Sequence, residues 1–352
     1  MANVLVTGGS GFIAGHIIIR LLEEGHDVRA TVRSPGKEKA VRAVLADAGL
    51  RDDSALTFVT ADLMADEGWA EAVAGREHVL HVASPVHLQR VENENDVIDP
   101  AREGTLRVLR AARDAGVRRV VLTSAFHAVG FGHPHTHGTF TEEDWSVLDG
   151  PGMDAYGKSK ILAERAAWEF VAEQGNGMEL VTMLPVAVMG PVMGDAISGS
   201  NHVVQRILDG GMPAYPNMWM PIVDVRDVAT AHVLAMTTPD AAGQRFLVSS
   251  GPSIALKDVG ALLRENLGSA ARKVPTRTMP DFVVRLASRF QPEFRSVAAD
   301  LGFVKVVSND KARRVLGWQP RPAREAVLAA GQSMVQRSLA GEAVSDNSVG
   351  RQ

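Results

Sequence analysis

Tyr156 and Lys160 are the two side chains whose types and spacing are best suited to catalysis in this 352-residue chain. They stand four positions apart, so on a helix both side chains would lie on the same face. A free tyrosine has a pKa of about 10, and a cation held nearby stabilises the tyrosinate and lowers that pKa. Tyrosine is also scarce, since Tyr215 is the only other one. The pair predicts acid–base catalysis in which Tyr156 protonates a carbonyl oxygen.

A glycine-rich turn near the amino terminus predicts a dinucleotide site. Val4–Thr7 is a short β-branched run typical of a buried strand, and Phe12–Glu24 has the apolar periodicity of a helix. Between them, Gly8 permits the tight turn and Gly11 lets the backbone approach a pyrophosphate at the helix amino terminus. We expect cofactor contacts from the residues of this turn, namely Thr7, Gly8, Gly11, Phe12 and Ile13.

The end of the second predicted strand indicates which nicotinamide cofactor binds. An acidic residue there would bind the adenosine ribose hydroxyls and repel a 2′-phosphate, but the strand ends in Val32-Arg33, with Lys37 and Lys39 close behind. We therefore predict NADP(H), with Arg33 on the 2′-phosphate and Lys37 or Lys39 assisting. Asp62, after the third strand, would either accept a hydrogen bond from the adenine amino group or cap the following turn.

Short apolar runs alternate with amphipathic helical stretches through the first half of the chain. This alternation predicts an α/β fold, a Rossmann-type doubly wound parallel sheet covered on both faces. We expect the NADP-binding core at residues 1–190 and a smaller substrate-binding lobe mainly at 191–340, with 221–250 returning to the core. The polar segment 341–352 is predicted to be a disordered tail.

Composition excludes several classes of function. The formal charge of −4 gives no general attraction to nucleic acid, and no apolar stretch approaches the length of a membrane span. Cysteine is absent, which excludes disulfides and thiolate chemistry and fits a reducing cytoplasm, where we expect the protein. His133, His135 and His137 alternate in a Gly- and Pro-containing segment, and we interpret them as a loop rather than a metal site.

The motifs together resemble one family. The chain is similar to the extended short-chain dehydrogenases/reductases, and in particular to the dihydroflavonol reductase and cinnamoyl-CoA reductase branch with its microbial aldehyde and ketone reductases. The matching strings follow the family's order, from Thr7–Gly15 through Ala30–Arg33, Ala61–Leu63, Val82–Pro85, Glu103–Thr105, Val121–Ser124, Tyr156–Lys160 and Leu184–Pro191 to Val223–Val228. The resemblance implies further cofactor contacts from Leu63, Val82, Ala83, Ser84, Pro185 and Val188.

One position departs from the family pattern. Relatives carry a serine that orients the substrate carbonyl, and Ala125 occupies its place when Val129-Gly130 sets the register. Our hypothesis is that Ser124 supplies this hydrogen bond, with His127 or Ser84 as alternatives. His127 and Met220 are expected to contact substrate. The apolar residues around Met220 either form an ordinary lobe core or line a pocket for a hydrophobic carbonyl compound.

These observations favour a reversible NADPH-dependent reductase of aldehydes or ketones. The substrate would be a small carbonyl compound or alcohol, and a homodimer is compatible with the sequence. Two alternatives remain open. The first is a nucleotide-sugar epimerase or dehydratase of the same extended family, which would retain NAD. The second is a non-catalytic NADP(H)-sensing protein, which would have little need of Tyr156 and Lys160.

Overall fold

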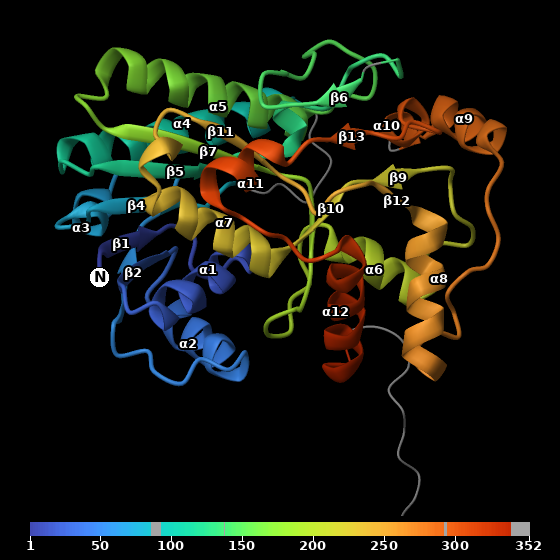
Figure 1. The fold of residues 1–352 in the computed structure, drawn as a ribbon, viewed down its shortest axis with the longest axis horizontal. Helices are drawn as coiled ribbons and strands as arrows, with labels where there is room; N and C mark the ends of the chain where they lie inside the picture. Colours follow the sequence, from blue (N-terminus) through green and yellow to red (C-terminus); the bar gives the residue numbers. More distant parts are fainter. Residues whose placement is uncertain (86–92, 137, 292–293, 339–352) are drawn as a thin grey trace, which may run out of the picture.

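The computed structural model describes residues 1–85, 93–136, 138–291 and 294–338. A seven-stranded sheet lies at its centre, with its strands in the order β11-β7-β5-β4-β1-β2-β3 and all neighbours parallel (Figure 1). The strands are β1 (Asn3–Val6), β2 (Asp27–Val32), β3 (Leu56–Thr60), β4 (His78–His81), β5 (Arg119–Thr123), β7 (Glu179–Pro185) and β11 (Arg245–Val248). The predicted Rossmann-type sheet is confirmed.

Helices cover both faces of the sheet, which explains why its strands are apolar on both sides. All five residues of β5 are buried. One face packs against α1 (Phe12–Glu23), α2 (Lys37–Asp47) and α7 (Val225–Thr237), and the other against α3 (Trp69–Val73), α4 (Asn95–Asp114) and α5 (Ala155–Gln174). The chain changes direction between neighbours β1 and β4, so a crevice opens at the carboxyl ends of these strands.

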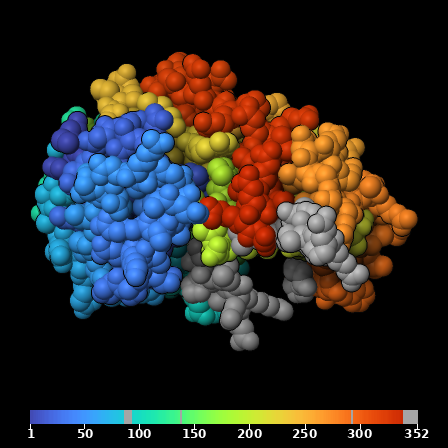
Figure 2. Space-filling model, turned by 90° about the horizontal axis from the view of Figure 1, so that it is seen from below, coloured from blue at the N-terminus to red at the C-terminus, as the bar shows by residue number. Residues whose placement is uncertain are grey.

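The carboxyl-terminal lobe has its own apolar core. Val204, Tyr215, Leu263 and Val327 belong to this core and are buried. They join α6 (Asn201–Leu208), α8 (Leu256–Leu267) and α12 (Ala323–Gln336) with the short strand pair β9 (Trp219–Met220) and β12 (Ile254–Ala255). Two more helices, α9 (Asp281–Phe290) and α10 (Phe294–Ala299), lie at the outer end of this lobe (Figure 1). The core, in blue, and the lobe, in orange and red, stand side by side in Figure 2.

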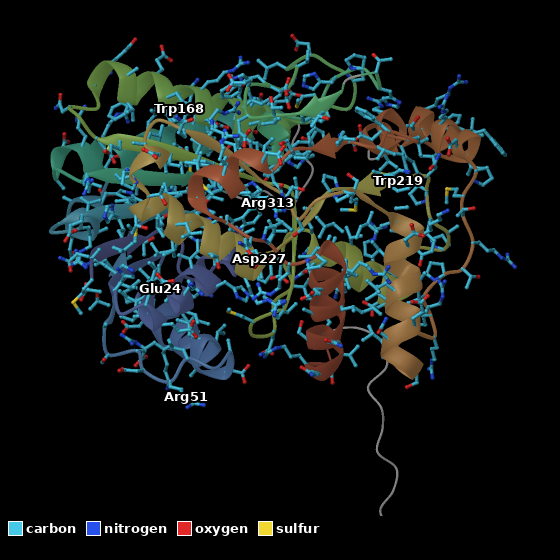
Figure 3. All side chains as sticks on the ribbon, viewed as in Figure 1. Glu24, Arg51, Trp168, Trp219, Asp227 and Arg313 are labelled. Atoms are coloured by element: carbon cyan, nitrogen blue, oxygen red, sulfur yellow. The ribbon has the colours of Figure 1, made fainter. Side chains whose placement is uncertain are left out.

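The chain crosses between the core and the lobe several times. Strand β8 (Ala187–Met189) pairs with β10 (Ile222–Asp224), and α11 (Asp310–Leu316) packs on β11 and α7. Trp318, just after α11, is buried in the main core, and its indole donates to the Asp227 carbonyl at 2.9 Å. The Arg321 amide donates to the Asp227 carboxylate at 2.7 Å, near the centre of Figure 3. Asp227 therefore ties the last helices to α7.

Helices and strands account for most of the described chain. None of the helices in the described ranges is both long and apolar enough to cross a membrane. The segment 341–352, predicted to be disordered, lies outside the described residues.

Candidate active site

A cavity of about 1090 Å³ occupies the crevice at the carboxyl ends of the strands and continues into the lobe. It collects most of the residues that the sequence singles out. Those that line it are Gly8, Gly11, Phe12, Ile13, Arg33, Asp62, Leu63, Val82, Ala83, Ser84, Ser124, His127, Tyr156, Lys160, Pro185, Val188 and Met220. Thr7 and Lys37 do not line it.

The glycine turn forms one wall of the cavity. Gly8 has a φ of +72°, and a Cβ there would lie 3.0 Å from the Ala83 Cβ, so this position requires glycine. The Gly11 amide donates to the Gly8 carbonyl at 2.8 Å. Gly11 is the N-cap of α1 and has no side chain to accept from the first turn, so the amides of that turn stay available to an anion.

Thr7 lies beneath this turn, and its hydrogen bonds to described residues hold the backbone in place. It is fully buried, and its Oγ1 accepts from the Val82 and Ala83 amides at 3.0 Å each. The same hydroxyl is 2.8 Å from Nδ1 of the buried His81. Thr7 thus fixes the end of β4, whose following residues line the cavity.

Arg33 and Asp62 lie at the ends of neighbouring strands β2 and β3. Arg33 is exposed, lines the cavity and forms no ion pair with any described residue. The Asp62 carboxylate accepts from the Met64 amide at 3.0 Å, so it caps its local turn while it lines the cavity. Lys37 begins α2 and is exposed outside the cavity.

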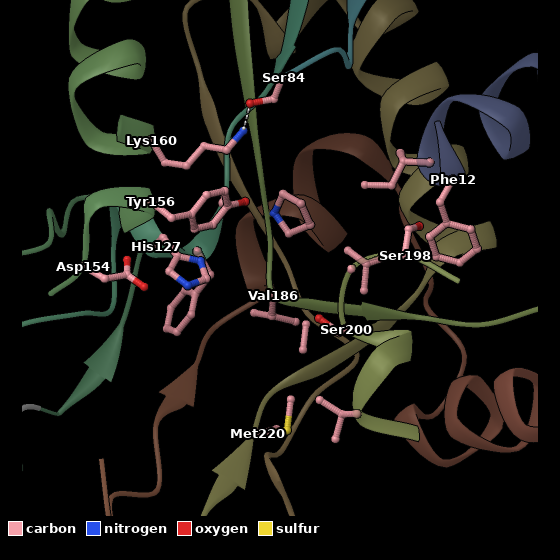
Figure 4. A pocket seen from close by; sticks show the side chains of 18 of the residues that line it. Phe12, Ser84, His127, Asp154, Tyr156, Lys160, Val186, Ser198, Ser200 and Met220 are labelled. Atoms are coloured by element: carbon pink, nitrogen blue, oxygen red, sulfur yellow. Dashed lines mark hydrogen bonds between the residues drawn. The ribbon is translucent and has the colours of Figure 1, made fainter. Parts of the chain in front are cut away.

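Tyr156 and Lys160 project from the first turns of α5 toward the cavity. Asp154 is the N-cap of this helix and accepts from the Gly157 amide at 2.8 Å, which places Tyr156 at its second residue. Lys160 Nζ donates to Ser84 Oγ at 3.1 Å and lies 5.8 Å from the centroid of the Tyr156 ring. Figure 4 shows the Tyr156 hydroxyl directed into the cavity, with Lys160 beside it.

The pKa values of this pair are shifted by the surrounding protein. Burial, with the Asp154 charge as a smaller cause, raises the pKa of Tyr156 to about 12. Burial lowers the pKa of the Lys160 ammonium to about 8. The spacing of the pair predicted a lowered tyrosine pKa, and the structure has the opposite direction. The reason is that desolvation of the phenol is the largest cause of the shift, and the ammonium, 5.8 Å from the ring centroid, does not offset it.

Ser124 lines the cavity, but its hydroxyl is engaged elsewhere. It is buried at the end of β5 and donates to Oε2 of the buried Glu164 at 2.6 Å. Glu164 also accepts from Thr182 Oγ1 at 2.9 Å and from Arg245 Nε at 2.8 Å. The proposed role of Ser124 toward a substrate carbonyl stays a prediction.

His127 lies beside Tyr156. It belongs to a short 3₁₀ turn, η1 (Phe126–Ala128), that follows β5, and its ring centroid is 5.0 Å from that of Tyr156 with the planes at 81°. The ring is stacked on Phe131 at 4.2 Å and 8°. Desolvation lowers the pKa of His127 to about 4.

Several lining residues were not identified from the sequence. Asp154 had a local signal, because an Asp three residues before Gly157 at a helix start is a typical N-cap. Phe131, Asp300 and Lys305 had no such signal in the sequence. Asp300 and Lys305 come from the lobe, far along the chain from the other site residues. Lys305 is buried, pairs with Asp300 at 2.7 Å and places its Nζ 3.7 Å from the Phe131 ring centroid.

The histidine-rich segment packs against the lobe. His133 Nε2 donates to the Val129 carbonyl at 2.9 Å, and His135 Nε2 donates to the Ala299 carbonyl at 2.7 Å. His137 lies outside the described residues. Within the described ranges, no three His, Asp or Glu side chains are grouped so that they could hold a metal ion.

Comparison with known proteins places the chain in a family. Residues 4–249 match the model of the NAD dependent epimerase/dehydratase family, so the chain belongs to that family. The expected resemblance to the extended short-chain dehydrogenases/reductases is confirmed.

Relatives and solved structures cover most or nearly all of the chain. The ketoreductase azaE of Aspergillus niger is 33% identical over 356 residues, which span 96% of this chain and 98% of that protein. Cinnamoyl-CoA reductase CAD2 of Medicago truncatula is 36% identical over 250 residues, 70% of this chain and 75% of that protein. The structure of yeast methylglyoxal/isovaleraldehyde reductase Gre2 complexed with NADPH aligns with a TM-score of 0.78 at 26% identity, covering 96% of this chain and 99% of that one.

Proposed function

We propose that this protein is an NADPH-dependent oxidoreductase that reduces aldehydes or ketones to alcohols and catalyses the reverse reaction. The observation that carries the proposal is that Tyr156 and Lys160 line the same cavity as the glycine turn and Arg33. The names of the relatives agree with it, because they include a ketoreductase, a cinnamoyl-CoA reductase and an aldehyde reductase complexed with NADPH.

The residues at one end of the cavity fit NADP(H). The uncapped amino terminus of α1 and the close approach permitted at Gly8 and Gly11 suit a pyrophosphate. Arg33 has no carboxylate partner among the described residues, so its guanidinium is free to bind a 2′-phosphate. Leu63, Val82 and Ala83 line the cavity between these groups and Tyr156. When bound, NADPH supplies the hydride for the reduction.

Tyr156 supplies the proton. Its pKa of about 12 keeps the phenol protonated at neutral pH, which is the state that can donate to a carbonyl oxygen. Proton donation leaves a tyrosinate, and the Lys160 cation next to the ring stabilises that charge. The same raised pKa disfavours the tyrosinate needed to start alcohol oxidation. At neutral pH the free enzyme therefore holds Tyr156 in the protonated form that reduction requires.

The substrate end of the cavity contains a cluster of apolar side chains. Met212, Met218, Trp219, Met220 and Leu256 line it from the lobe. In the view of Figure 4, Met220 lies at the opposite end from Ser84 and Lys160. Such side chains favour a hydrophobic or aromatic group attached to the carbonyl carbon.

A panel of aliphatic and aromatic aldehydes and ketones, assayed by the loss of NADPH absorbance, tests the proposal. We expect turnover of at least one hydrophobic carbonyl compound and at least about a tenfold preference for NADPH over NADH, as expected from one charged hydrogen bond. Two results would overturn the proposal. One is purified protein that retains NAD⁺, and the other is protein that fails to oxidise NADPH with every carbonyl compound in the panel.

A further inference from the structure

We propose that His127 is a catalytic residue that donates a hydrogen bond from its imidazole to the substrate carbonyl oxygen, alongside the hydroxyl of Tyr156. This inference rests on the proposed carbonyl reduction and assigns a second donor to that reaction. The arrangement of the polar side chains around Tyr156 supports this assignment.

A carbonyl oxygen gains negative charge as its carbon is reduced, and preorganised donors aimed at that oxygen stabilise the transition state. Tyr156 supplies one such donor. The other neutral side-chain donors that line this part of the cavity, at the ends of β4 and β5 and in η1, are Ser84, Thr123, Ser124 and His127. The Thr123 hydroxyl lies 2.8 Å from Nε2 of the buried His232 and is engaged there.

The Ser124 proton is already engaged, and Ser84 is set apart from Tyr156 by its position. The Ser124 proton is directed to Oε2 of Glu164, a carboxylate buried behind the cavity wall. Ser84 Oγ accepts from Lys160 Nζ, and in the view of Figure 4 it lies beyond Lys160 from Tyr156. Ser84 therefore extends the hydrogen bonding of Lys160 at the end of β4.

The His127 imidazole lies next to Tyr156, and its N–H donor has no partner among the described residues. Its ring lies edge-to-face with the Tyr156 ring, and Figure 4 shows it next to Tyr156 on the same side of the cavity. Neither ring nitrogen forms a hydrogen bond with a side chain or backbone group in the part of the chain that the structure describes. A substrate oxygen that accepts from Tyr156 would therefore lie next to the imidazole.

The orientation of the imidazole is held by a stack of three groups. His127 lies parallel to Phe131 at 4.2 Å, and Lys305 Nζ lies 3.7 Å from the centroid of the same ring. Both are too close to share one face, so they lie on opposite faces of Phe131. Asp300 holds the Lys305 ammonium at 2.7 Å. This stack limits rotation of the imidazole, as preorganisation of a donor requires.

The protonation state agrees with a donor role. Desolvation is the largest cause that lowers the pKa of His127 to about 4; the charges of Lys305 and Lys160 also lower it, while those of Asp154 and Asp300 raise it. The ring is therefore neutral at neutral pH and carries one N–H donor. A neutral imidazole leaves proton transfer to Tyr156.

The test compares His127→Phe with a rescue variant. Phenylalanine keeps a ring to stack on Phe131 but removes the N–H donor, so we expect kcat to fall by about 100- to 1,000-fold. The Kd for NADPH should change by less than about threefold, because His127 lies away from the glycine turn and Arg33. Ala125 is buried and also lines the cavity. Adding Ala125→Ser to His127→Phe introduces a hydroxyl there and should recover at least about tenfold in kcat.

His135→Phe is the matched control, because His135 is an exposed histidine stacked on Phe303 that does not line the cavity. Its kcat should stay within about twofold of the wild type. A His127→Phe enzyme that keeps kcat within about threefold, or loses kcat but shows no recovery with Ala125→Ser while still binding NADPH, would overturn the role of His127. Wild-type protein with no carbonyl reduction would instead overturn the proposed function.

Discussion

The Ser124 hydroxyl lies 2.6 Å from the Glu164 carboxylate; both side chains are buried, with Ser124 in the wall of the cavity and Glu164 behind it. Glu164 comes from the middle of α5 and gathers Thr182 on β7 and Arg245 on β11 as well. A buried carboxylate is stable only when its oxygens are paired and hydrogen-bonded. Ser124 therefore helps to join α5 to three strands of the sheet.

Ser124→Ala should reduce stability more than activity. Loss of a donor to a buried carboxylate costs about 1–3 kcal/mol in the free energy of unfolding, which chemical denaturation measures. We expect kcat to stay within about fivefold of the wild type, because the hydroxyl is directed to Glu164. Thr182→Val removes another donor to the same carboxylate from outside the cavity and should destabilise similarly. A fall in kcat near 100-fold with little change in stability would instead assign the carbonyl hydrogen bond to Ser124.

Arg33→Met should weaken NADPH binding specifically. A hydrogen bond to a charged group contributes about 1.5–3 kcal/mol, so the Kd for NADPH should rise about 10- to 100-fold while the Kd for NADH stays unchanged. Arg51→Met is the control, since it removes the same charge from an exposed site outside the cavity (Figure 3). Titration calorimetry with both cofactors measures the difference. Equal weakening of NADPH and NADH by Arg33→Met would count against a 2′-phosphate site.

The pH dependence of reduction should report Lys160. Burial lowers the pKa of its ammonium to about 8, so the cation is present below that pH and is lost as the pH rises through it. Tyr156 stays protonated over this range, because its pKa is about 12. We therefore expect kcat/KM to be constant near neutrality and to fall above about pH 8.

Lys160→Arg tests whether loss of the Lys160 charge causes the fall in kcat/KM above pH 8. A guanidinium keeps its charge to a pH of about 12 or higher, so the remaining activity of this variant should not fall above pH 8. The measurement is kcat/KM against pH for both proteins with the same carbonyl substrate. The same alkaline fall in both would show that another group titrates.

Most of the sheet could be predicted because its signals are local. The predicted strand at Val4–Thr7 and helix at Phe12–Glu24 agree to within one residue with β1 (Asn3–Val6) and α1 (Phe12–Glu23). The β-branched runs, the glycine turn and the helical periodicities each lie within one short segment. The return of Trp318 to the main core had no such signal, because its partner Asp227 is 91 residues away.

The site residues also divide into those with a local sequence signal and those that only the fold brings together. The glycine turn and the pair Tyr156 and Lys160 are local motifs, and the structure brings them to one cavity. The Ser124–Glu164 hydrogen bond joins residues 40 positions apart, and the Lys305–Phe131–His127 stack joins the lobe to the core. The direction of the Tyr156 pKa shift depends on how deeply the phenol is desolvated, which spacing along a helix does not reveal.

The proton donor is the central element of this account, and Tyr156→Phe tests it most directly. This change removes one hydroxyl and keeps the ring, so turnover and NADPH affinity can be measured on the same folded protein. We predict that kcat for carbonyl reduction falls about 10²- to 10⁴-fold, as expected for loss of a general acid. The Kd for NADPH should stay within about threefold. A variant that binds NADPH normally and keeps kcat within about threefold of the wild type would contradict the assignment of Tyr156.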